Sequence, residues 1–274
     1  MTYVNGKTAV LTGAGSGIGR ALAVQLNREG CELYLSDISA DCLNETLAML
    51  SRKEIFADMH VLDVAEKLSV HRWAENIAET RGHVDIVINN AGVGLVSSVE
   101  NHRYEDFEWL MGINFWGVVY GTQAFLPLLR KSQQGHLVNI SSVFGLMSAP
   151  TQSAYNAAKF AVRGYTEALR QEMDGGNVHV CCVHPGGIKT NIARAARSGD
   201  SDLNADERNS EFQKLAHTSP EEAAAQIVGA VEKRKKRLLI GMDAKLISLV
   251  CRLFPVRYPR ILGMRTGTTG KRLK

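Results

Sequence analysis

Short apolar runs alternate with helical patterns along most of the chain, and this alternation limits the folds that the chain can adopt. The strand-like runs are Thr8–Thr12, Glu32–Ser36, His60–Leu62, Asp85–Asn89, His136–Ser141, His179–Val183 and Leu238–Ile240. The helical patterns among them are Gly17–Glu29, Ala40–Leu50, Glu66–Thr80, Tyr104–Arg130 and Ser153–Met173. Apolar strands that alternate with helices form βαβ units and a parallel sheet. The sequence therefore predicts an α/β, single-domain, doubly wound parallel sheet of six to seven strands with helices on both faces.

Composition and spacing exclude several other classes of protein. Of the 274 residues, 45% are hydrophobic and 22% are charged, which is typical of globular chains and not of disordered or fibrous ones. No apolar run reaches the roughly 18 residues of a membrane span, and the first residues lack the apolar stretch of a secretory signal. We therefore expect a cytoplasmic protein. The five cysteines include no C-x-x-C pair and the histidines no H-x-x-x-H pair, so neither a disulfide framework nor a metal site is expected.

A glycine-rich segment, T-G-A-G-S-G-I-G, follows the first predicted strand and opens the first predicted helix. Dinucleotide pyrophosphates bind at such a helix N-terminus, and glycines let the backbone turn sharply and approach the phosphates. The spacing is Gly-x3-Gly-x-Gly and differs from the common G-x-G-x-x-G fingerprint. We expect Gly13, Ser16, Gly17, Ile18 and Gly19 to bind the cofactor, with a glycine-rich turn that binds nothing as the alternative.

Asp37 ends the second predicted strand and bears on the choice of cofactor. A carboxylate at this point can accept hydrogen bonds from the ribose hydroxyls of adenosine, and it repels a 2′-phosphate. Neither Ile38 nor Ser39 is basic, and the loop holds Ser16 where a base could stand. The sequence therefore favours NAD over NADP, with a helix N-cap as the other interpretation of Asp37.

Tyr155 and Lys159 lie four residues apart on a predicted helix and so share one face. A free tyrosine has a pKa of about 10, and a nearby ammonium lowers it. The pair can then exchange a proton with an alcohol or ketone oxygen, although such pairs also occur on ordinary surfaces. Ser142 follows a predicted strand, where its hydroxyl can bond the same oxygen or cap the strand end. Asn114 is a poor helix former inside a long helical pattern, so it can hold a water, kink the helix or make a buried hydrogen bond.

In order and spacing, these motifs resemble the classical short-chain dehydrogenase/reductase family over about Lys7 to Leu239. The resemblance implies a Rossmann sheet and a catalytic set made of Asn114, Ser142, Tyr155 and Lys159. Tyr155 and Lys159 would also touch the cofactor. Further cofactor contacts are implied by the D-V pair, the N-N-A-G motif and the P-G-x-x-x-T segment, at Asp63, Val64, Asn90, Ala91, Gly92, Pro185, Ile188 and Thr190.

The resemblance also implies the role of each catalytic residue. Tyr155 would be the acid/base at the substrate oxygen, and Lys159 would hold the nicotinamide ribose and lower the pKa of Tyr155. Ser142 would position and polarise the substrate oxygen, and Asn114 would support a water-linked proton relay to Lys159. We therefore expect an NAD-dependent oxidoreductase that acts on CH-OH groups. The alternative is a non-redox or NAD-sensing member of the same scaffold, but such proteins often lack the tyrosine or the lysine.

The segments expected to line the substrate pocket are Val93–Val96, Val143–Pro150 and the region after Pro185, and the first two contain no Lys or Arg. A substrate carboxylate or phosphate would need such a partner. We therefore expect an uncharged, fairly apolar secondary alcohol or ketone as the small-molecule substrate. The polar stretch Arg197–Ser210 is expected to be a loop, within a segment, Arg194–His217, that closes over the substrate.

The family resemblance further implies a homodimer or homotetramer. Members commonly pair through the helices that correspond here to about Phe107–Arg130 and Ser153–Met173. Gly117 and Gly121 lie four residues apart in the first of them, and we expect their small size to let paired helices approach closely.

The end of the chain differs from the rest in charge. Lys233–Lys274 holds 13 Lys and Arg residues but a single acid, Asp243. We assign residues 1–242 to the dinucleotide-binding and catalytic domain and residues 243–274 to a basic, amphipathic C-terminal extension. Within the extension, apolar side chains recur at spacings of three and four up to Pro255, at Leu246, Leu249, Val250, Leu253 and Phe254.

Two interpretations of this helix stay open. It can pack on the protein or on a neighbouring subunit and cover the substrate pocket, or it can make peripheral contact with an anionic membrane. Nucleic acid binding is not expected, because no aromatic stacking platform accompanies the charge.

Overall fold

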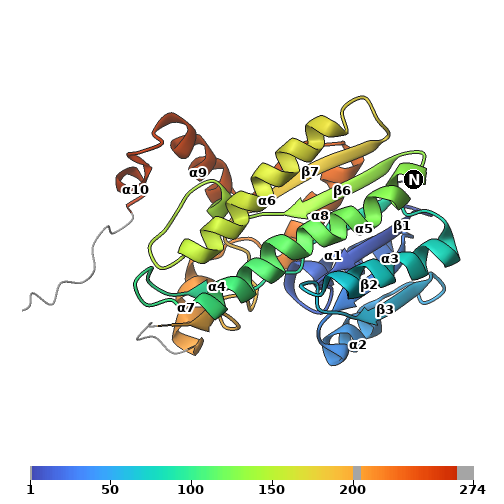
Figure 1. The fold of residues 1–274 in the computed structure, drawn as a ribbon, viewed down its shortest axis with the longest axis horizontal. Coiled ribbons are helices and arrows are strands. Elements are labelled where there is room, and N and C mark those ends of the chain that lie inside the picture. The colour runs from blue at the N-terminus through green and yellow to red at the C-terminus, as the bar shows by residue number, and fades with distance from the viewer. Residues whose placement is uncertain (1, 200–204, 264–274) are drawn as a thin grey trace, which may run out of the picture.

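The computed structural model of the chain describes residues 2–199 and 205–263. Its centre is a seven-stranded sheet with the order β3-β2-β1-β4-β6-β7-β9, and every neighbouring pair is parallel (Figure 1). The strands are β1 (Thr8–Thr12), β2 (Glu32–Asp37), β3 (Ala57–Val61), β4 (Ile86–Asn89), β6 (Gly135–Ile140), β7 (Val178–Pro185) and β9 (Arg237–Ile240). The predicted doubly wound parallel sheet is therefore confirmed.

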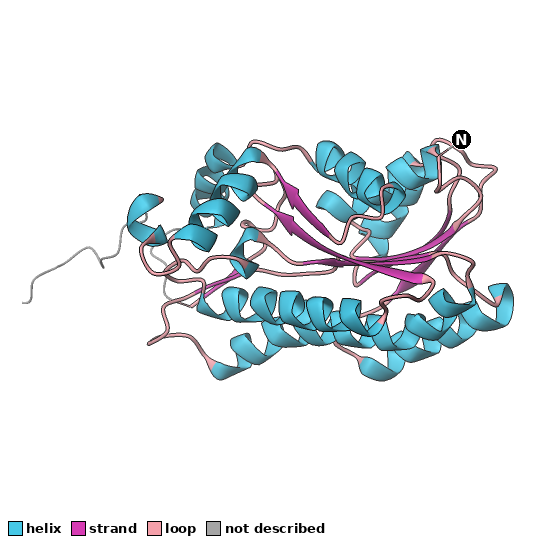
Figure 2. Cartoon of the chain, turned by 90° about the horizontal axis from the view of Figure 1, so that it is seen from above, coloured by secondary structure: helices cyan, strands magenta, loops and turns pink. Residues whose placement is uncertain are grey.

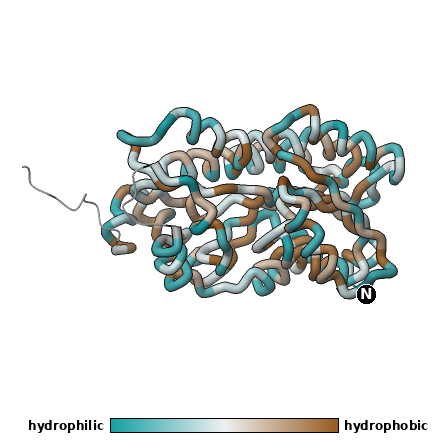
Figure 3. The backbone as a smooth tube through the Cα atoms, turned by 90° about the horizontal axis from the view of Figure 1, so that it is seen from below, coloured by the Kyte–Doolittle hydropathy of each residue, from teal (hydrophilic) through white to brown (hydrophobic). Residues whose placement is uncertain are grey.

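Helices cover both faces of the sheet, which Figure 2 shows nearly edge-on. Alternate strand residues point to opposite faces. Leu11, Leu33 and Ile88 pack with one group of helices, namely α1 (Gly17–Arg28), α2 (Ala40–Met49) and α8 (Pro220–Glu232). Val10 and Val87 pack with the other group, namely α3 (Lys67–Arg81), α5 (Gly117–Lys131) and α6 (Ser153–Glu172). The strands thus form the apolar middle layer of the molecule (Figure 3).

Several stretches differ from the sequence-based expectation. The strand expected at His60–Leu62 is β3, at Ala57–Val61, and helix α8 had no expected counterpart. The single long helix expected over Tyr104–Arg130 is interrupted: α4 (Tyr104–Met111) and α5 are joined by a π-helical segment, Gly112–Trp116. The expected loop Arg197–Ser210 instead contains a short strand, β8 (Arg197–Ser198), and the start of helix α7 (Ala205–Leu215). β8 pairs with β5 (Leu95–Val96) in a separate two-stranded sheet. Because α7 is mostly polar and β8 is two residues long, neither has an apolar period that the sequence could reveal.

Two helices follow the last strand, α9 (Met242–Leu253) and α10 (Tyr258–Ile261). None of the helices within 2–199 and 205–263 combines the length and apolarity that a membrane span requires. The predicted cytoplasmic location stays a prediction.

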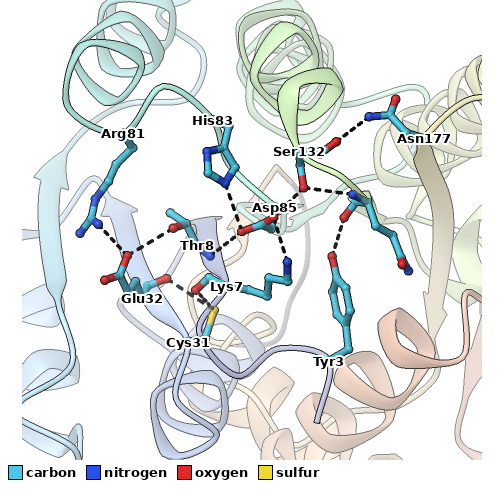
Figure 4. Close-up of polar contacts among 11 residues, drawn as sticks. Tyr3, Lys7, Thr8, Cys31, Glu32, Arg81, His83, Asp85, Ser132 and Asn177 are labelled. Carbon is cyan, nitrogen blue, oxygen red and sulfur yellow. Dashed lines mark hydrogen bonds and ion pairs between the residues drawn. The ribbon is translucent and has the colours of Figure 1, made fainter. Parts of the chain in front are cut away.

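A polar cluster around Asp85 ties the amino ends of β1 and β4 together (Figure 4). The Asp85 side chain is buried and accepts hydrogen bonds from the Thr8 backbone N–H, at 3.0 Å, and from the Ser132 hydroxyl, at 2.6 Å. The Lys7 ammonium lies 3.5 Å from the same carboxylate. A buried carboxylate is tolerated only when it is paired and hydrogen-bonded in this way.

Replacing Asp85 should therefore destabilise the fold. We expect Asp85→Ala to lower the free energy of unfolding by about 3 kcal/mol, because it leaves buried donors without an acceptor. The matched control is Glu54→Ala, which removes one partner of the exposed Arg52–Glu54 pair and should leave the free energy of unfolding almost unchanged. Urea denaturation of the three proteins measures both effects. Equal stability of Asp85→Ala and the unchanged protein would contradict this account of the cluster.

Candidate active site

The predicted site residues gather where the strands of the sheet end. The glycine loop follows β1, Asp37 ends β2, Asn90 follows β4 and Pro185 ends β7. In an open parallel sheet, ligands bind outside the carboxyl ends of the strands, where neighbouring connections leave in opposite directions. β1 and β4 are neighbours here, and the chain passes from β1 outward to β2 and from β4 outward to β6.

The glycine loop lies directly against the segment that follows β4. Gly13 has a φ of 68°, and a Cβ on it would lie 2.7 Å from the Ala91 Cα. A Cβ on Gly19 would lie 1.9 Å from the Gly13 carbonyl oxygen. The Asn90 amide donates to the carbonyls of Thr12 and Gly13, at 3.0 and 3.1 Å. Only glycine fits at positions 13 and 19 without a shift of this backbone.

The N-terminus of α1 is available to an anion. Ser16 is the N-cap residue, its side chain is exposed, and it makes no capping hydrogen bond. The first N–H groups of a helix have no partner within the helix, and they attract a phosphate. Gly17 and Ile18 begin this helix, as the sequence predicts for a pyrophosphate site.

Asp37 faces the same loop from the end of β2. Its carboxylate accepts hydrogen bonds from the backbone N–H of Gly15, at 2.9 Å, and of Ser39, at 3.1 Å. The N-cap of α2 is Ser39, whose side chain accepts from the Cys42 N–H. The alternative interpretation of Asp37 as the cap of that helix is therefore wrong, and its carboxylate borders the loop expected to hold the cofactor.

Asn114 sits in the π-helical segment and is fully buried. Its side chain accepts from the Val93 N–H at 2.8 Å and donates to the Val93 carbonyl at 2.9 Å. This two-bond contact holds the chain just after Gly92. A Cβ on Gly92 would lie 3.3 Å from Asn114 Oδ1 and 3.5 Å from Lys159 Nζ, so the three residues lie together. Of the three possibilities that the sequence left open, the buried hydrogen bond and the break in the α-helix both hold.

Tyr155 and Ser142 meet on the substrate side of the site. The Ser142 hydroxyl hydrogen-bonds Tyr155, and it also accepts from the Phe144 N–H at 3.1 Å. Burial raises the pKa of Tyr155 to about 12, and the hydrogen bond with Ser142 lowers it only in part. The expected lowering of this pKa by Lys159 is not found, since the two causes of the shift are burial and the hydrogen bond with Ser142. At neutral pH, Tyr155 is a neutral phenol that can donate a proton.

Lys159 is buried one helical turn further along α6. Its ammonium donates to the Ile140 carbonyl at 3.0 Å and lies 5.7 Å from the centre of the Tyr155 ring. Burial lowers the pKa of Lys159 to about 8. The Ser141 hydroxyl donates to the Lys159 carbonyl at 2.8 Å, so the end of β6 and α6 are fixed to each other at this point.

The other predicted cofactor contacts lie around this arrangement. Val64 is buried against Gly117, and Asp63 accepts from the Ala65 N–H in its own turn. Ile188 is buried, and the Thr190 side chain lies against Gly17 of the glycine loop. Within the described residues, no group of three or more His, Cys, Asp or Glu side chains is placed to hold a metal ion.

Comparison with known proteins agrees with this geometry. The family description "short chain dehydrogenase" matches residues 7–201. This chain belongs to the short-chain dehydrogenase family. SadH of Mycobacterium tuberculosis, named as a candidate oxidoreductase, is 46% identical over 267 residues, which make up 96% of each chain. This short-chain dehydrogenase is therefore an oxidoreductase by family.

Solved structures of relatives hold either nicotinamide cofactor. A short-chain dehydrogenase/reductase from Burkholderia phymatum, in complex with NAD, matches all of both chains at 28% identity and a TM-score of 0.82. An alcohol dehydrogenase from Thermococcus sibiricus, complexed with 5-hydroxy-NADP, matches 85% of this chain and 95% of its own at 26% identity and a TM-score of 0.74. Family membership thus leaves the choice between NAD and NADP to the residues of this short-chain dehydrogenase.

Two residues near the site had no signal in the sequence. His184 is fully buried in β7, and its Nδ1 lies 3.1 Å from the Ser142 carbonyl oxygen, which places it directly behind the predicted catalytic serine. Burial lowers the pKa of His184 to about 4, so the ring is neutral at pH 7. Arg20 donates to the Gly15 carbonyl at 2.5 Å and pairs with Glu45 at 2.6 Å. The positions of His184 and Arg20 could not be predicted, because the residues that they contact come from other elements of the fold.

The buried ammonium of Lys159 should cost this short-chain dehydrogenase stability. Its pKa falls from 10.5 to about 8 in the folded chain, a change that corresponds to roughly 3 kcal/mol. Because the unfolded chain takes up the proton first, the penalty develops as the pH falls from 10.5 to about 8 and is complete below that.

We therefore expect Lys159→Met to raise the free energy of unfolding at pH 7 by up to about 3 kcal/mol while it abolishes turnover. The gain should shrink as the pH rises toward 10.5. Urea denaturation at several pH values measures it, with Lys67→Met, at a position that is exposed on α3, as the control. A Lys159→Met protein that is less stable than the unchanged protein at pH 7 would show that the hydrogen bond to Ile140 outweighs the desolvation.

Proposed function

We propose that this short-chain dehydrogenase transfers a hydride between NAD(H) and an uncharged, fairly apolar secondary alcohol or ketone. The observation that carries the proposal is the meeting of Ser142, Tyr155 and Lys159 beside the glycine loop. A bound nicotinamide would supply or accept the hydride. The residues of the chain would bind it, orient the substrate and move the proton.

Tyr155 is the proton donor or acceptor in this proposal. Because burial keeps it as a phenol at neutral pH, it can donate to a ketone oxygen during reduction. The Ser142 hydroxyl, which already contacts Tyr155, would hold the same oxygen. Lys159 would hold the nicotinamide ribose, and Asn114, which lies beside it, would support the relay that returns a proton to Tyr155.

Replacing the phenol tests this assignment. Tyr155→Phe removes only the hydroxyl, so we expect an unchanged fold and cofactor affinity but a kcat at least about 100-fold lower. Tyr104→Phe, at an exposed tyrosine on α4, is the matched control and should keep full activity. NADH absorbance in single time courses gives kcat, and cofactor titration gives affinity. A Tyr155→Phe protein with more than about a tenth of the original kcat would remove Tyr155 from the mechanism.

The preference for NAD over NADP belongs to the same proposal and is supported by Asp37. Its carboxylate borders the glycine loop, and the neighbouring Ile38 is exposed and uncharged. The Arg20 guanidinium bonds the Gly15 carbonyl of the loop, and it is already paired with Glu45. A 2′-phosphate would therefore be repelled by the Asp37 carboxylate, and neither Ile38 nor the paired Arg20 would offer it a free positive charge.

Replacing the negative charge of Asp37 with a positive charge at its neighbour should change the cofactor preference. We expect Asp37→Ala with Ile38→Arg to move the preference in kcat/KM toward NADP(H), because it removes the repulsion and adds a phosphate partner. Ile38→Arg alone keeps the carboxylate and should move it less. Steady-state kinetics with both cofactors decides the matter. If the unchanged enzyme already prefers NADPH, Asp37 does not set the choice.

The surroundings of Ser142 and Gly92 support an apolar substrate. Leu95, Val143, Leu146 and Met147, which lie in the first two segments predicted to line the pocket, are all largely buried. Arg197 enters this region on β8, but its guanidinium bonds Asp106 at 2.9 Å and lies 3.7 Å from the centre of the Trp109 ring. This pairing engages the one guanidinium that β8 itself carries, so Arg197 is not free to bind a substrate carboxylate.

We also propose that the chain works as a homodimer or homotetramer through α5 and α6. Trp116 and Phe160 are exposed near these helices, and Trp116 stacks on Tyr120. The expectation that Gly117 and Gly121 let paired helices approach closely is wrong. A Cβ on Gly121 would lie 2.2 Å from Asn89 Oδ1, and Gly117 meets Val64, so the two glycines bring α5 close to the body of its own subunit.

Light scattering at micromolar concentration tests the assembly. We expect a mass of two or four times 30.0 kDa for the unchanged chain. Trp116→Glu with Phe160→Glu should shift the protein toward the single-chain mass, because buried unpaired carboxylates oppose association. A mass of 30.0 kDa for the unchanged chain would contradict the proposal.

A division of the chain at residue 242 completes the proposal. All predicted catalytic and cofactor residues lie between Gly13 and Thr190, and the last strand of the sheet ends at Ile240. The extension is nonetheless anchored to the domain, because the Asp243 carboxylate accepts from the Gly187 N–H at 2.7 Å.

A further inference from the structure

Helix α9 carries its large apolar side chains outward. Met242, Leu246, Leu249 and Leu253 are 76, 57, 55 and 60% exposed. Their spacing of four, three and four residues places them on one narrow stripe of the helix. Phe254, Val256 and Ile261 extend the exposed apolar surface into the following turn and α10. We call these seven residues the apolar stripe.

The opposite side of α9 is fixed to the domain. Ala244 is fully buried there, and the Ser248 hydroxyl accepts from the Arg237 guanidinium at 3.1 Å. At the start of the helix, Asp243 is bonded to Gly187. At α10, the Tyr258 hydroxyl accepts from the Ser148 N–H at 3.0 Å. The helix therefore cannot turn its stripe inward without breaking these contacts. Of the two interpretations from the sequence, packing on its own chain holds for the side opposite the stripe, while covering of the substrate pocket stays a prediction.

Cations flank the stripe. Lys245 and Arg252 each precede a leucine of the stripe by one position and line one edge of it, and Arg257 and Arg260 lie beside α10. All four are exposed, and no acidic residue occurs from 244 to 274. A second copy docked stripe to stripe would bring these cations against their own equivalents. An anionic surface pairs with them instead, and its interior accepts the leucines.

We propose that α9 and α10 form a docking surface for an anionic lipid bilayer. The leucines would enter the boundary of the acyl chains, and the four cations would contact the lipid phosphates. In Figure 1, both helices project from the end of the molecule where α4 and α7 also lie. Through Tyr258 and Ser148, the surface is joined to Val143–Pro150, a segment predicted to line the substrate pocket. This docking proposal does not depend on the proposed hydride transfer.

Co-sedimentation of the full chain with vesicles tests the proposal. The vesicles are pure phosphatidylcholine, or phosphatidylcholine and phosphatidylglycerol in equal parts, at low and at high salt. We expect binding to the mixed vesicles at low salt, weaker binding at high salt and little binding to phosphatidylcholine alone. Leu246→Gln with Leu249→Gln, and separately Lys245→Glu with Arg252→Glu, should each weaken binding more than about tenfold.

Matched controls separate docking from folding and from catalysis. Leu68→Gln with Val99→Gln replaces two apolar side chains outside the stripe that are even more exposed than Leu246 and Leu249, and this variant should bind vesicles like the unchanged chain. All variants should keep the thermal midpoint and the turnover of a water-soluble ketone, because every replaced side chain is exposed and none is a predicted catalytic or cofactor residue.

Three results would overturn the proposal. One is an unchanged chain that stays in the supernatant with the mixed vesicles at low salt. Another is equal binding by the stripe variant and by the Leu68→Gln, Val99→Gln control. The third is a light-scattering mass that falls in Leu246→Gln with Leu249→Gln, since it would show that a second copy covers the stripe. An enzyme that lacks turnover but binds vesicles as expected would leave docking in place and count only against the proposed function.

Discussion

The contact between the glycine loop and the chain after β4 fixes the relative positions of the other parts of the site. The two backbones touch at Gly13 and Ala91, which is possible only because positions 13 and 19 carry no side chain. Asn90 joins them by hydrogen bonds to Thr12 and Gly13. From there, Gly92 reaches Asn114 and Lys159. One continuous set of contacts therefore links the loop expected to hold phosphates with the lysine expected to hold the ribose.

The two edges of the sheet have opposite energetic characters. At the carboxyl edge, Lys159 is buried and Tyr155 half-buried, and their pKa values are shifted against their charged forms. Such groups cost stability, and perturbed groups of this kind gather at functional sites. At the amino edge, the Asp85 carboxylate accepts hydrogen bonds from Thr8 and Ser132 and pairs with Lys7. We interpret the amino edge as the part that holds the sheet together while the carboxyl edge is arranged for chemistry.

Sequence patterns predicted the elements that bury a regular apolar face, and they missed those that depend on a partner. Strands such as β1 and β6 were predictable because each has an apolar centre, at residues 9–11 and 137–138. The break at Asn114 is set by its bonds to Val93, and β8 exists only because β5 lies beside it. The apolar period of α9 was visible in the sequence, but its outward direction was not, because the anchoring contacts of Asp243 and Ser248 lie far along the chain or in another element. His184 likewise gained its place behind Ser142 only through folding.

Hydride transfer is the central claim, and the fate of the carbinol hydrogen tests it most directly. A panel of apolar secondary alcohols labelled with deuterium at the carbinol carbon would be oxidised with NAD, and the reduced cofactor examined by NMR. We expect deuterium at C4 of the nicotinamide and a slower single-turnover rate than with the unlabelled alcohol. Deuterium released to water while NAD stays oxidised would contradict the account and indicate proton abstraction by a non-redox member of the scaffold.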